Sequence, residues 1–178
     1  MSVNQPRSKP DLQDILHIGG KGLLIEWSVI SGTASDSQLY PTFGKILSMA
    51  MPNDRKSLCF SGEFGHASQK FLEIGHNPID FGRPMHKTLA IAVTNQGDSL
   101  WLSSADSGSN FKQIRLSSSL VVEKNLAKEL KGVSAMLSSP NGKWIFAGFQ
   151  DGSLLRISLD RGVVDGKWRS FSKGKITC

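Results

Sequence analysis

Residues 133–159 read VSAMLSSPNGKWIFAGFQDGSLLRISL and predict three short strands joined by two tight turns. The run 133–138 is rich in strand-forming side chains, and the apolar runs 144–147 and 154–159 follow it. Pro140-Asn141-Gly142 and Gln150-Asp151-Gly152 separate the three runs. An Asp-Gly pair between apolar runs favours a hairpin, because glycine adopts positive φ without strain. The stretch therefore predicts two consecutive hairpins.

Weaker copies of this turn-and-strand pattern occur upstream. The glycines at positions 22, 65, 97 and 152 each mark a turn that precedes a short apolar run. Their separations are 43, 32 and 55 residues, with a mean of about 43. One four-stranded propeller blade takes about 40–45 residues, so this mean indicates an array of blades. We assign the long last interval to an insertion in the polar stretch 103–119.

Two lead-in segments also match, because residues 46–53 (ILSMAMPN) share the pattern of residues 133–141. On these motifs the chain resembles the WD40-type β-propeller family, best over residues 133–159, less well over 46–74 and loosely elsewhere. Members of that family carry a Gly-His pair early in the repeat and a Trp-Asp pair at the end of the third strand. Gly75-His76 precedes Trp101 at a similar separation, but Leu102 stands where the Asp is expected. The nearest counterpart of the family's buried hydrogen-bond network is the set His76, Thr94, Asp98 and Trp101.

The expected fold class is all-β, a WD40-like β-propeller of about four blades that is part of a larger or incomplete propeller. We expect a flexible lead-in over residues 1–10 and blades over approximately 11–43, 44–75, 76–125 and 126–172. The first blade is expected to lack its innermost strand, because the chain enters almost directly into the hairpin 15–27.

Residues 173–178 resemble the opening of a blade at 43–48 and predict the start of a further strand. One interpretation is that Ile176-Thr177 closes a small ring against residues 15–27. The other, which we favour because four-bladed rings are rare, is that the chain is the front part of a longer propeller.

The composition fits an all-β protein that can form a core, with 39% hydrophobic residues, 18 glycines and 7 prolines. No apolar run approaches the roughly 20 residues of a membrane span, and the first twenty residues lack the apolar centre of a signal peptide. The two cysteines, Cys59 and Cys178, make no disulfide framework, and we expect Cys59 to be a buried free thiol. These features predict a cytoplasmic or nuclear protein.

One segment, residues 121–131, predicts a short helix. Its apolar residues Val122, Leu126 and Leu130 recur every four positions, and Gly132 stands at the expected C-terminal cap. We interpret the segment as a helical excursion between blades that packs on the rim or docks a partner, and a strand is the alternative.

The net charge of +6 is concentrated near the C-terminus, because residues 126–178 contain 9 basic and 4 acidic side chains. Basic residues interleaved with Trp168 and Phe171 are typical of polyanion binding, in which cations contact the backbone and rings stack on bases. The candidate polyanion-binding residues are Lys167, Arg169, Lys173 and Lys175. The competing interpretation places Val164, Trp168 and Phe171 in the core and leaves the cations in solvent.

No arrangement of residues points to catalysis. Gly19-Gly20-Lys21-Gly22 leads into an apolar strand, whereas a Walker A loop leads into a helix. The four histidines show no metal-binding spacing, and no GxSxG elbow is present. We therefore expect no enzyme activity, no catalytic residues, no cofactor and no metal site.

The predicted function is a non-catalytic protein-protein interaction scaffold, since the resemblance implies blades that present loops and a rim to partner proteins within a larger complex. The partner could also be a complementary propeller half or a second copy of the chain. The candidate partner-binding residues are His66, Asp98, Gln150 and Asp151, with residues 103–131 as the most individual segment. The alternative is an RNA- or DNA-associated propeller that binds polyanions through its basic C-terminal segment.

Overall fold

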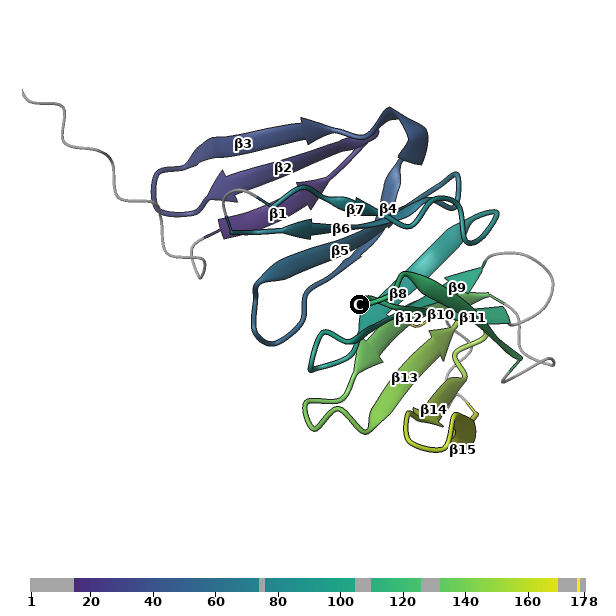
Figure 1. Cartoon of the computed structure of the whole chain (residues 1–178). Helices are drawn as coiled ribbons and strands as arrows, with labels where there is room; N and C mark the ends of the chain where they lie inside the picture. The colour runs from purple at the N-terminus through teal and green to yellow at the C-terminus, as the bar shows by residue number, and fades with distance from the viewer. Residues whose placement is uncertain (1–14, 74–75, 105–109, 126–131, 170–175, 177–178) are drawn as a thin grey trace, which may run out of the picture.

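The computed structural model describes residues 15–73, 76–104, 110–125, 132–169 and 176. Within these ranges the chain forms four consecutive antiparallel sheets and no α-helix, so the all-β prediction is confirmed (Figure 1). None of these sheets closes on itself. In the part of the chain that the structure describes, no helix has the length and apolar character needed to cross a membrane.

Each sheet is a meander whose neighbouring strands follow one another in the sequence. The first sheet has three strands, β1 (Ile15–Gly19), β2 (Leu23–Ser28) and β3 (Thr33–Leu39). The second has four, β4 (Ile46–Ala50), β5 (Ser57–Gly62), β6 (Ala67–Phe71) and β7 (Ile79–Asp80). The third consists of β8 (Thr88–Val93), β9 (Ser99–Ser104), β10 (Asn110–Arg115) and β11 (Leu120–Asn125). The fourth consists of β12 (Val133–Ser138), β13 (Trp144–Phe149), β14 (Leu154–Ser158) and β15 (Val163–Trp168).

The stretch 133–159 folds as its sequence predicts. It forms β12, β13 and β14, and the two connecting turns place Gly142 at φ 67° and Gly152 at φ 80°. Both values lie in the left-handed region, where glycine avoids the clash of a Cβ atom. The hairpin expected over residues 15–27 is likewise confirmed as β1 and β2, and the turn at Gly65 is followed by β6 at Ala67–Phe71.

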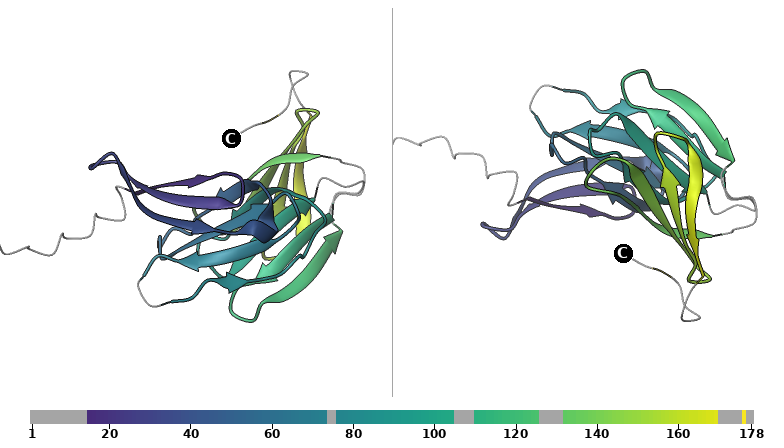
Figure 2. Two further views of the ribbon diagram at one scale, coloured as in Figure 1. Left: turned by 90° about the horizontal axis from the view of Figure 1, so that it is seen from above. Right: turned by 90° about the horizontal axis from the view of Figure 1, so that it is seen from below.

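Adjacent sheets pack face to face (Figure 2). Between them lie three separate apolar clusters. Leu24 and Phe60 belong to the cluster between the first and second sheets. Cys59 and Leu102 belong to the second cluster, and Trp101 and Ile145 to the third. The core of the protein is therefore a series of layers between sheets, each supplied by the inward-alternating side chains of two sheets.

The first strands of the three complete sheets lie together. Strand β8 packs beside both β4 and β12, and each of these strands has a register shift near its start, after Ile46, Thr88 and Val133. The bulge bends each strand at the same place. The first sheet has no counterpart of β4 among the described residues, since β1 is at its edge.

The glycine repeat that we predicted mixes two kinds of turn. Gly22, Gly65 and Gly152 lie in turns β1–β2, β5–β6 and β13–β14, but Gly97 lies in turn β8–β9, at the start of the third sheet. Without Gly97 the separations are 43 and 87 residues, or one and two repeats. The apparent insertion over 103–119 is therefore wrong, because Asn110–Arg115 is the regular strand β10.

The helix predicted at 121–131 is also wrong where it is described. Residues up to Asn125 form β11, which pairs along its length with β10 and places Val122 opposite Gln113. Pairing with a neighbouring strand outweighs the helical spacing of Val122 and the apolar residues after it. The rest of that segment lies outside the described residues.

Candidate partner-binding surface

Three turns from three different sheets form a continuous surface, which we call the turn row. They join the first and second strands of the second, third and fourth sheets and comprise residues 51–56, 94–98 and 139–143 (Figure 1). The side-chain amide of Asn95 donates a hydrogen bond to the carbonyl oxygen of Pro140. On the other side, a Cβ atom at Gly97 would lie 3.3 Å from Cβ of Pro52. The middle turn therefore touches both of its neighbours.

Local side-chain hydrogen bonds hold each turn in shape. The Thr94 hydroxyl donates to the Asp98 carboxylate, and the carboxylate of Asp54 accepts a bond from the backbone N–H of Lys56 at 3.0 Å. Arg55 has φ 54°, which is unusual for a residue with a Cβ atom and costs roughly 1–3 kcal/mol. A non-glycine residue held in this conformation on an exposed turn is typical of functional surfaces.

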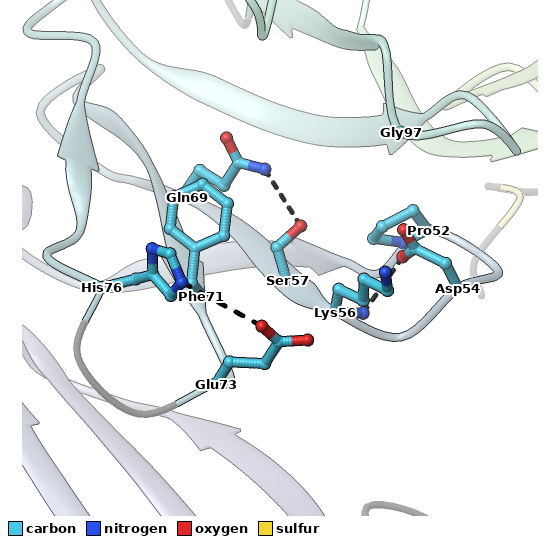
Figure 3. Close-up of a pocket in the computed structure, with 9 residues that line it drawn as sticks. All are labelled: Pro52, Asp54, Lys56, Ser57, Gln69, Phe71, Glu73, His76 and Gly97. Carbon is cyan, nitrogen blue, oxygen red and sulfur yellow. Dashed lines mark hydrogen bonds and ion pairs between the residues drawn. The ribbon is translucent and has the colours of Figure 1, made fainter.

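A cleft of about 280 Å³ opens at one end of the turn row, between the second sheet and Gly97 of the third (Figure 3). At its base the Nε2 atom of Gln69 donates to the Ser57 hydroxyl at 3.0 Å, and both side chains are buried. In Figure 3, Glu73 and His76 lie on one side of this pair and Asp54 and Lys56 on the other.

The cleft combines an apolar part with a charged rim. The ring of His76 lies 5.4 Å from that of Phe71, and its Nε2 atom lies 4.0 Å from Oε2 of the exposed Glu73. Pro52 supplies a second apolar wall. Small-molecule pockets usually measure about 300–1,000 Å³, so this cleft has room for one or two side chains of a protein partner rather than for a large cofactor.

The four predicted partner-binding residues do not form one surface. Asp98 lies in the turn row, whereas His66 lies in turn β5–β6 and Gln150 and Asp151 lie in turn β13–β14. Successive turns of an antiparallel meander lie at opposite ends of its strands, so three of the four residues are at the end away from the turn row. Gly97-Asp98 lies in the turn after the first strand of its sheet, whereas the other three residues lie in turns after the second strand. The sequence pattern therefore grouped Asp98 with turns at the opposite end of the sheets.

At that opposite end, His66 is half-buried, with its ring 5.5 Å from the ring of Phe43. Asp151 is exposed, and its carboxylate accepts a hydrogen bond from the backbone N–H of Ser153 at 2.9 Å. The Asp151 bond is of the kind that stabilises a turn, and the His66 ring packs against a neighbouring connection. The sequence missed Pro52, Phe71 and Asn95, whose only signal was their place next to turn-forming residues.

The basic residues of the C-terminal segment are likewise divided. Lys143 is exposed in the turn row, whereas the exposed Lys167 and Arg169 lie at or beyond the far end of β15. The other two candidate residues, Lys173 and Lys175, lie outside the described residues. Lys167 and Arg169 therefore lie at the opposite end of the fourth sheet from Lys143.

Trp168 is not a core residue, contrary to the competing interpretation of this segment. Its side chain is 42% exposed. A register shift between β14 and β15 leaves Asp165 unpaired, so that Val164 lies opposite Ile157 while Trp168 lies opposite Leu154. The extra residue reverses the alternation of side chains, which puts Val164 against the third sheet and Trp168 on the other face. Phe171 lies outside the described residues.

The hydrogen-bond network expected from the WD40 resemblance is not assembled. Thr94 and Asp98 are bonded, but the buried Nε1 atom of Trp101 has no partner within the described chain. His76 lies beside Glu73 and Phe71 in the cleft instead. The apolar core between the third and fourth sheets takes the place of that network around Trp101.

A polar cluster that the sequence did not predict links the first two sheets. Lys70 Nζ lies 2.7 Å from Oε1 of Glu26 and 3.0 Å from Oδ2 of Asp36, and Nε2 of His17 lies 3.8 Å from the same Glu26 oxygen. The His17 imidazole and the Lys70 ammonium together hold the pKa of Glu26 at about 2, although burial acts in the opposite direction. These charges satisfy one another, which indicates a structural role.

The described residues contain no group of three or more His, Cys, Asp or Glu side chains placed to hold a metal ion. No protein-family model matches this sequence, and no curated protein matches it.

Proposed function

We propose that the protein is a non-enzymatic interaction scaffold, a WD40-like β-propeller segment of about four blades that binds a partner protein on its turn row. The observation that carries this proposal is the contact of Asn95 with Pro140 and of Gly97 with Pro52, which joins turns from three sheets into one surface. A surface built from several rigid sheets can recognise a partner at several points without the cost of ordering long loops.

The propeller assignment has three supports. The four sheets are consecutive meanders, and the strands β4, β8 and β12 lie side by side. The glycines at 22, 65 and 152 are separated by 43 and 87 residues, which correspond to one repeat and two repeats. A blade of the WD40 type takes about 40–45 residues in four strands. Nuclear or cytoplasmic location and the absence of catalysis are part of the same proposal.

The chemistry of the turn row suits a peptide or loop that carries both an apolar side chain and charges. The cleft offers Pro52 and Phe71 to an apolar side chain, and Asp54, Lys56 and Glu73 provide charges of both signs around it. Charged groups at the rim of an interface select the partner and its orientation more than they add affinity. Polyanion binding has less support, because Lys143 and Lys167 lie at opposite ends of the fourth sheet.

The test is affinity enrichment of partners from cells that express the tagged protein, with quantitative mass spectrometry. Phe71→Ala together with Lys56→Glu should reduce recovery of the specific partners at least tenfold, because both the apolar wall and a rim charge are lost. Gln150→Ala together with Asp151→Ala, at the opposite end, is the matched control and should leave recovery unchanged. Equal loss in both double variants, or loss in the control alone, would overturn the assignment of the turn row.

A further inference from the structure

The four sheets place corresponding residues at corresponding positions. In each sheet, a residue near the middle of one strand lies opposite a residue near the middle of the strand that follows it in the sequence. These pairs are His17–Glu26, Cys59–Gln69, Trp101–Gln113 and Phe146–Arg156. We call this the central row. Because side chains alternate between the faces of a sheet, residues two positions away along a strand share the face of the central row.

In the first three sheets the next sheet covers the face that carries the central row. Glu26 meets Lys70 of the second sheet at 2.7 Å. Cys59 is buried with Ile91 of the third sheet, and Trp101 is buried with Ile145 of the fourth. The chain therefore forms the same kind of sheet-to-sheet junction three times.

Within the described residues, no further sheet packs on the corresponding face of the fourth sheet. Leu137, opposite Phe146, is 66% exposed, and Trp168, opposite Leu154, is 42% exposed. Arg156 lies between two aromatic rings, with its guanidinium carbon 5.3 Å from the centre of the Trp144 ring and 5.7 Å from that of Trp168. Exposed apolar and aromatic groups of this density are typical of interaction sites.

In the part of the chain that the structure describes, no sheet packs on the opposite face of the first sheet either. Ile18 is 41% exposed, Trp27 is 38% exposed and Leu39 is 66% exposed. Ile18 is the residue after the central-row residue of its strand, as Phe60, Leu102 and Ala147 are in the other sheets. Those three side chains are fully buried against the preceding sheet. The two uncovered faces are thus the two different halves of the junction that the chain makes internally.

We propose that two copies of this chain associate head to tail, with the first sheet of one copy packed on the fourth sheet of the other. Each exposed face repeats the pattern of a face that is already buried against its complement, so the contact between copies continues the series of junctions within the chain. Such a contact joins unlike surfaces, and two copies can satisfy both faces only by closing into a ring. It uses a surface other than the turn row, so it holds or fails separately from the proposed function.

Charge at the new junction is compatible with this packing. In the second sheet, Lys70 is the residue after the central-row residue Gln69, and it meets Glu26 across the first junction. In the first sheet, Trp27 is the residue after the central-row residue Glu26 and so occupies the corresponding position. Arg156 of one copy would therefore meet Trp27 of the other where Glu26 meets Lys70. A guanidinium group stacks favourably on an indole ring, whereas a second cation at this position would have repelled it.

Ile176 supplies a separate sign that the fourth sheet is built to meet another. Its backbone N–H donates to the carbonyl oxygen of Phe149 at 3.1 Å, as Ile46 N–H donates to Gly20 at 2.8 Å where the chain enters the second sheet. A Cβ atom at Gly148 would lie 2.5 Å from Ile176, and one at Gly19 would lie 2.7 Å from Ile46. The connection that precedes the junction of the first and second sheets is therefore repeated after the fourth.

The test is light scattering during size-exclusion chromatography of the full chain, from about 1 to 100 µM. We expect a species at twice the 19.4 kDa mass of the chain. Leu137→Glu, which breaks the fourth-sheet face, and Trp27→Lys, which places a cation against Arg156, should each give monomers. Leu120→Glu, at an apolar position of the third sheet that is 50% exposed, is the control and should remain dimeric.

Mixing the two monomeric variants gives the decisive result. Each variant keeps one intact face, so a head-to-tail contact predicts that the mixture recovers a dimer while each variant alone does not. Leu39→Glu, at a 66% exposed position, replaces Trp27→Lys if circular dichroism shows that the latter is unfolded. A wild-type monomer at every concentration would overturn the proposal and assign the faces to a different protein. A dimer that only one variant disrupts would overturn it as well, because that result indicates contact between like faces.

Discussion

Lys70 in the second sheet holds Glu26 in the first, with Nζ 2.7 Å from Oε1, and both side chains are largely withdrawn from solvent. This pair crosses the first junction between sheets, beside the apolar cluster that contains Leu24 and Phe60. It makes the first sheet, in which the described residues form three strands, dependent on ionisation for part of its attachment.

Acid should weaken this attachment. The pKa of Glu26 is about 2 in the folded protein, against a usual value of 4.5, so the stabilisation is complete above pH 4.5 and is lost as the pH falls from 4.5 toward 2. Glu26→Gln should lower the free energy of unfolding by about 1–3 kcal/mol at pH 7 and by much less near pH 2. Urea titrations at several pH values measure this difference. If Lys70→Met leaves the pH dependence of the Glu26 effect unchanged, the pair is not its cause.

Gly65 should tolerate no side chain. Its φ is 82°, and a Cβ atom would collide with the backbone carbonyl of Met85, in the connection that leads to the third sheet. Gly32 has φ 64° in an open turn, so Gly32→Ala isolates the cost of the backbone conformation alone, about 1–2 kcal/mol. Gly65→Ala should cost at least about 2 kcal/mol more, because backbone must move. Equal losses in chemical denaturation would contradict the close approach.

Cys59 should be unreactive in the folded protein. It is buried between the second and third sheets, and burial raises the pKa of its thiol to about 12. Since the thiolate is the nucleophile, a Cys178→Ser variant should show no reaction with a thiol reagent at pH 8 until it unfolds. In urea one equivalent should react. Rapid modification without urea would mean that this junction opens readily.

Asn95→Ala should loosen the turn row without disturbing the core. The Asn95 amide joins the third-sheet turn to Pro140 of the fourth, and its loss should cost about 0.5–1.5 kcal/mol. Hydrogen exchange should become faster in the turn 139–143, whereas the exposed neighbour Gln96 can be replaced by Ala without this effect. Unchanged exchange in that turn would show that the turns are independent and would remove the main support for the binding surface.

Much of the architecture was predictable because it depends on local chemistry. Asp151-Gly152 and Asn141-Gly142 specify turns through the conformations that glycine allows, and the strands between them follow. The face of Trp168 was not predictable, because it depends on one unpaired residue, Asp165, that shifts the register with β14. A bulge changes which side chains are buried but leaves no pattern in the chain that carries it.

The candidate site was less predictable for a related reason. Asp98 was identified through a glycine turn, but the end of the sheet at which a turn lies depends on how many strands precede it. The assignment of residues 121–125 failed because partners in β10, distant from any local helix signal, decide their conformation. Lys70 and Glu26 are 44 residues apart, and nothing near either residue indicates the other.

Cross-linking mass spectrometry of the protein with its captured partner locates the bound partner on the sheets. Exposed lysines mark both ends of the sheets: Lys56 and Lys143 lie in the turn row, whereas Lys21 and Lys45 lie in connections at the other end. A lysine-reactive cross-linker should join the partner to Lys56 and Lys143 and leave Lys21 and Lys45 free of partner cross-links. Cross-links confined to Lys21 and Lys45 would overturn the proposed binding surface, because the partner would then occupy the end of the sheets away from the turn row.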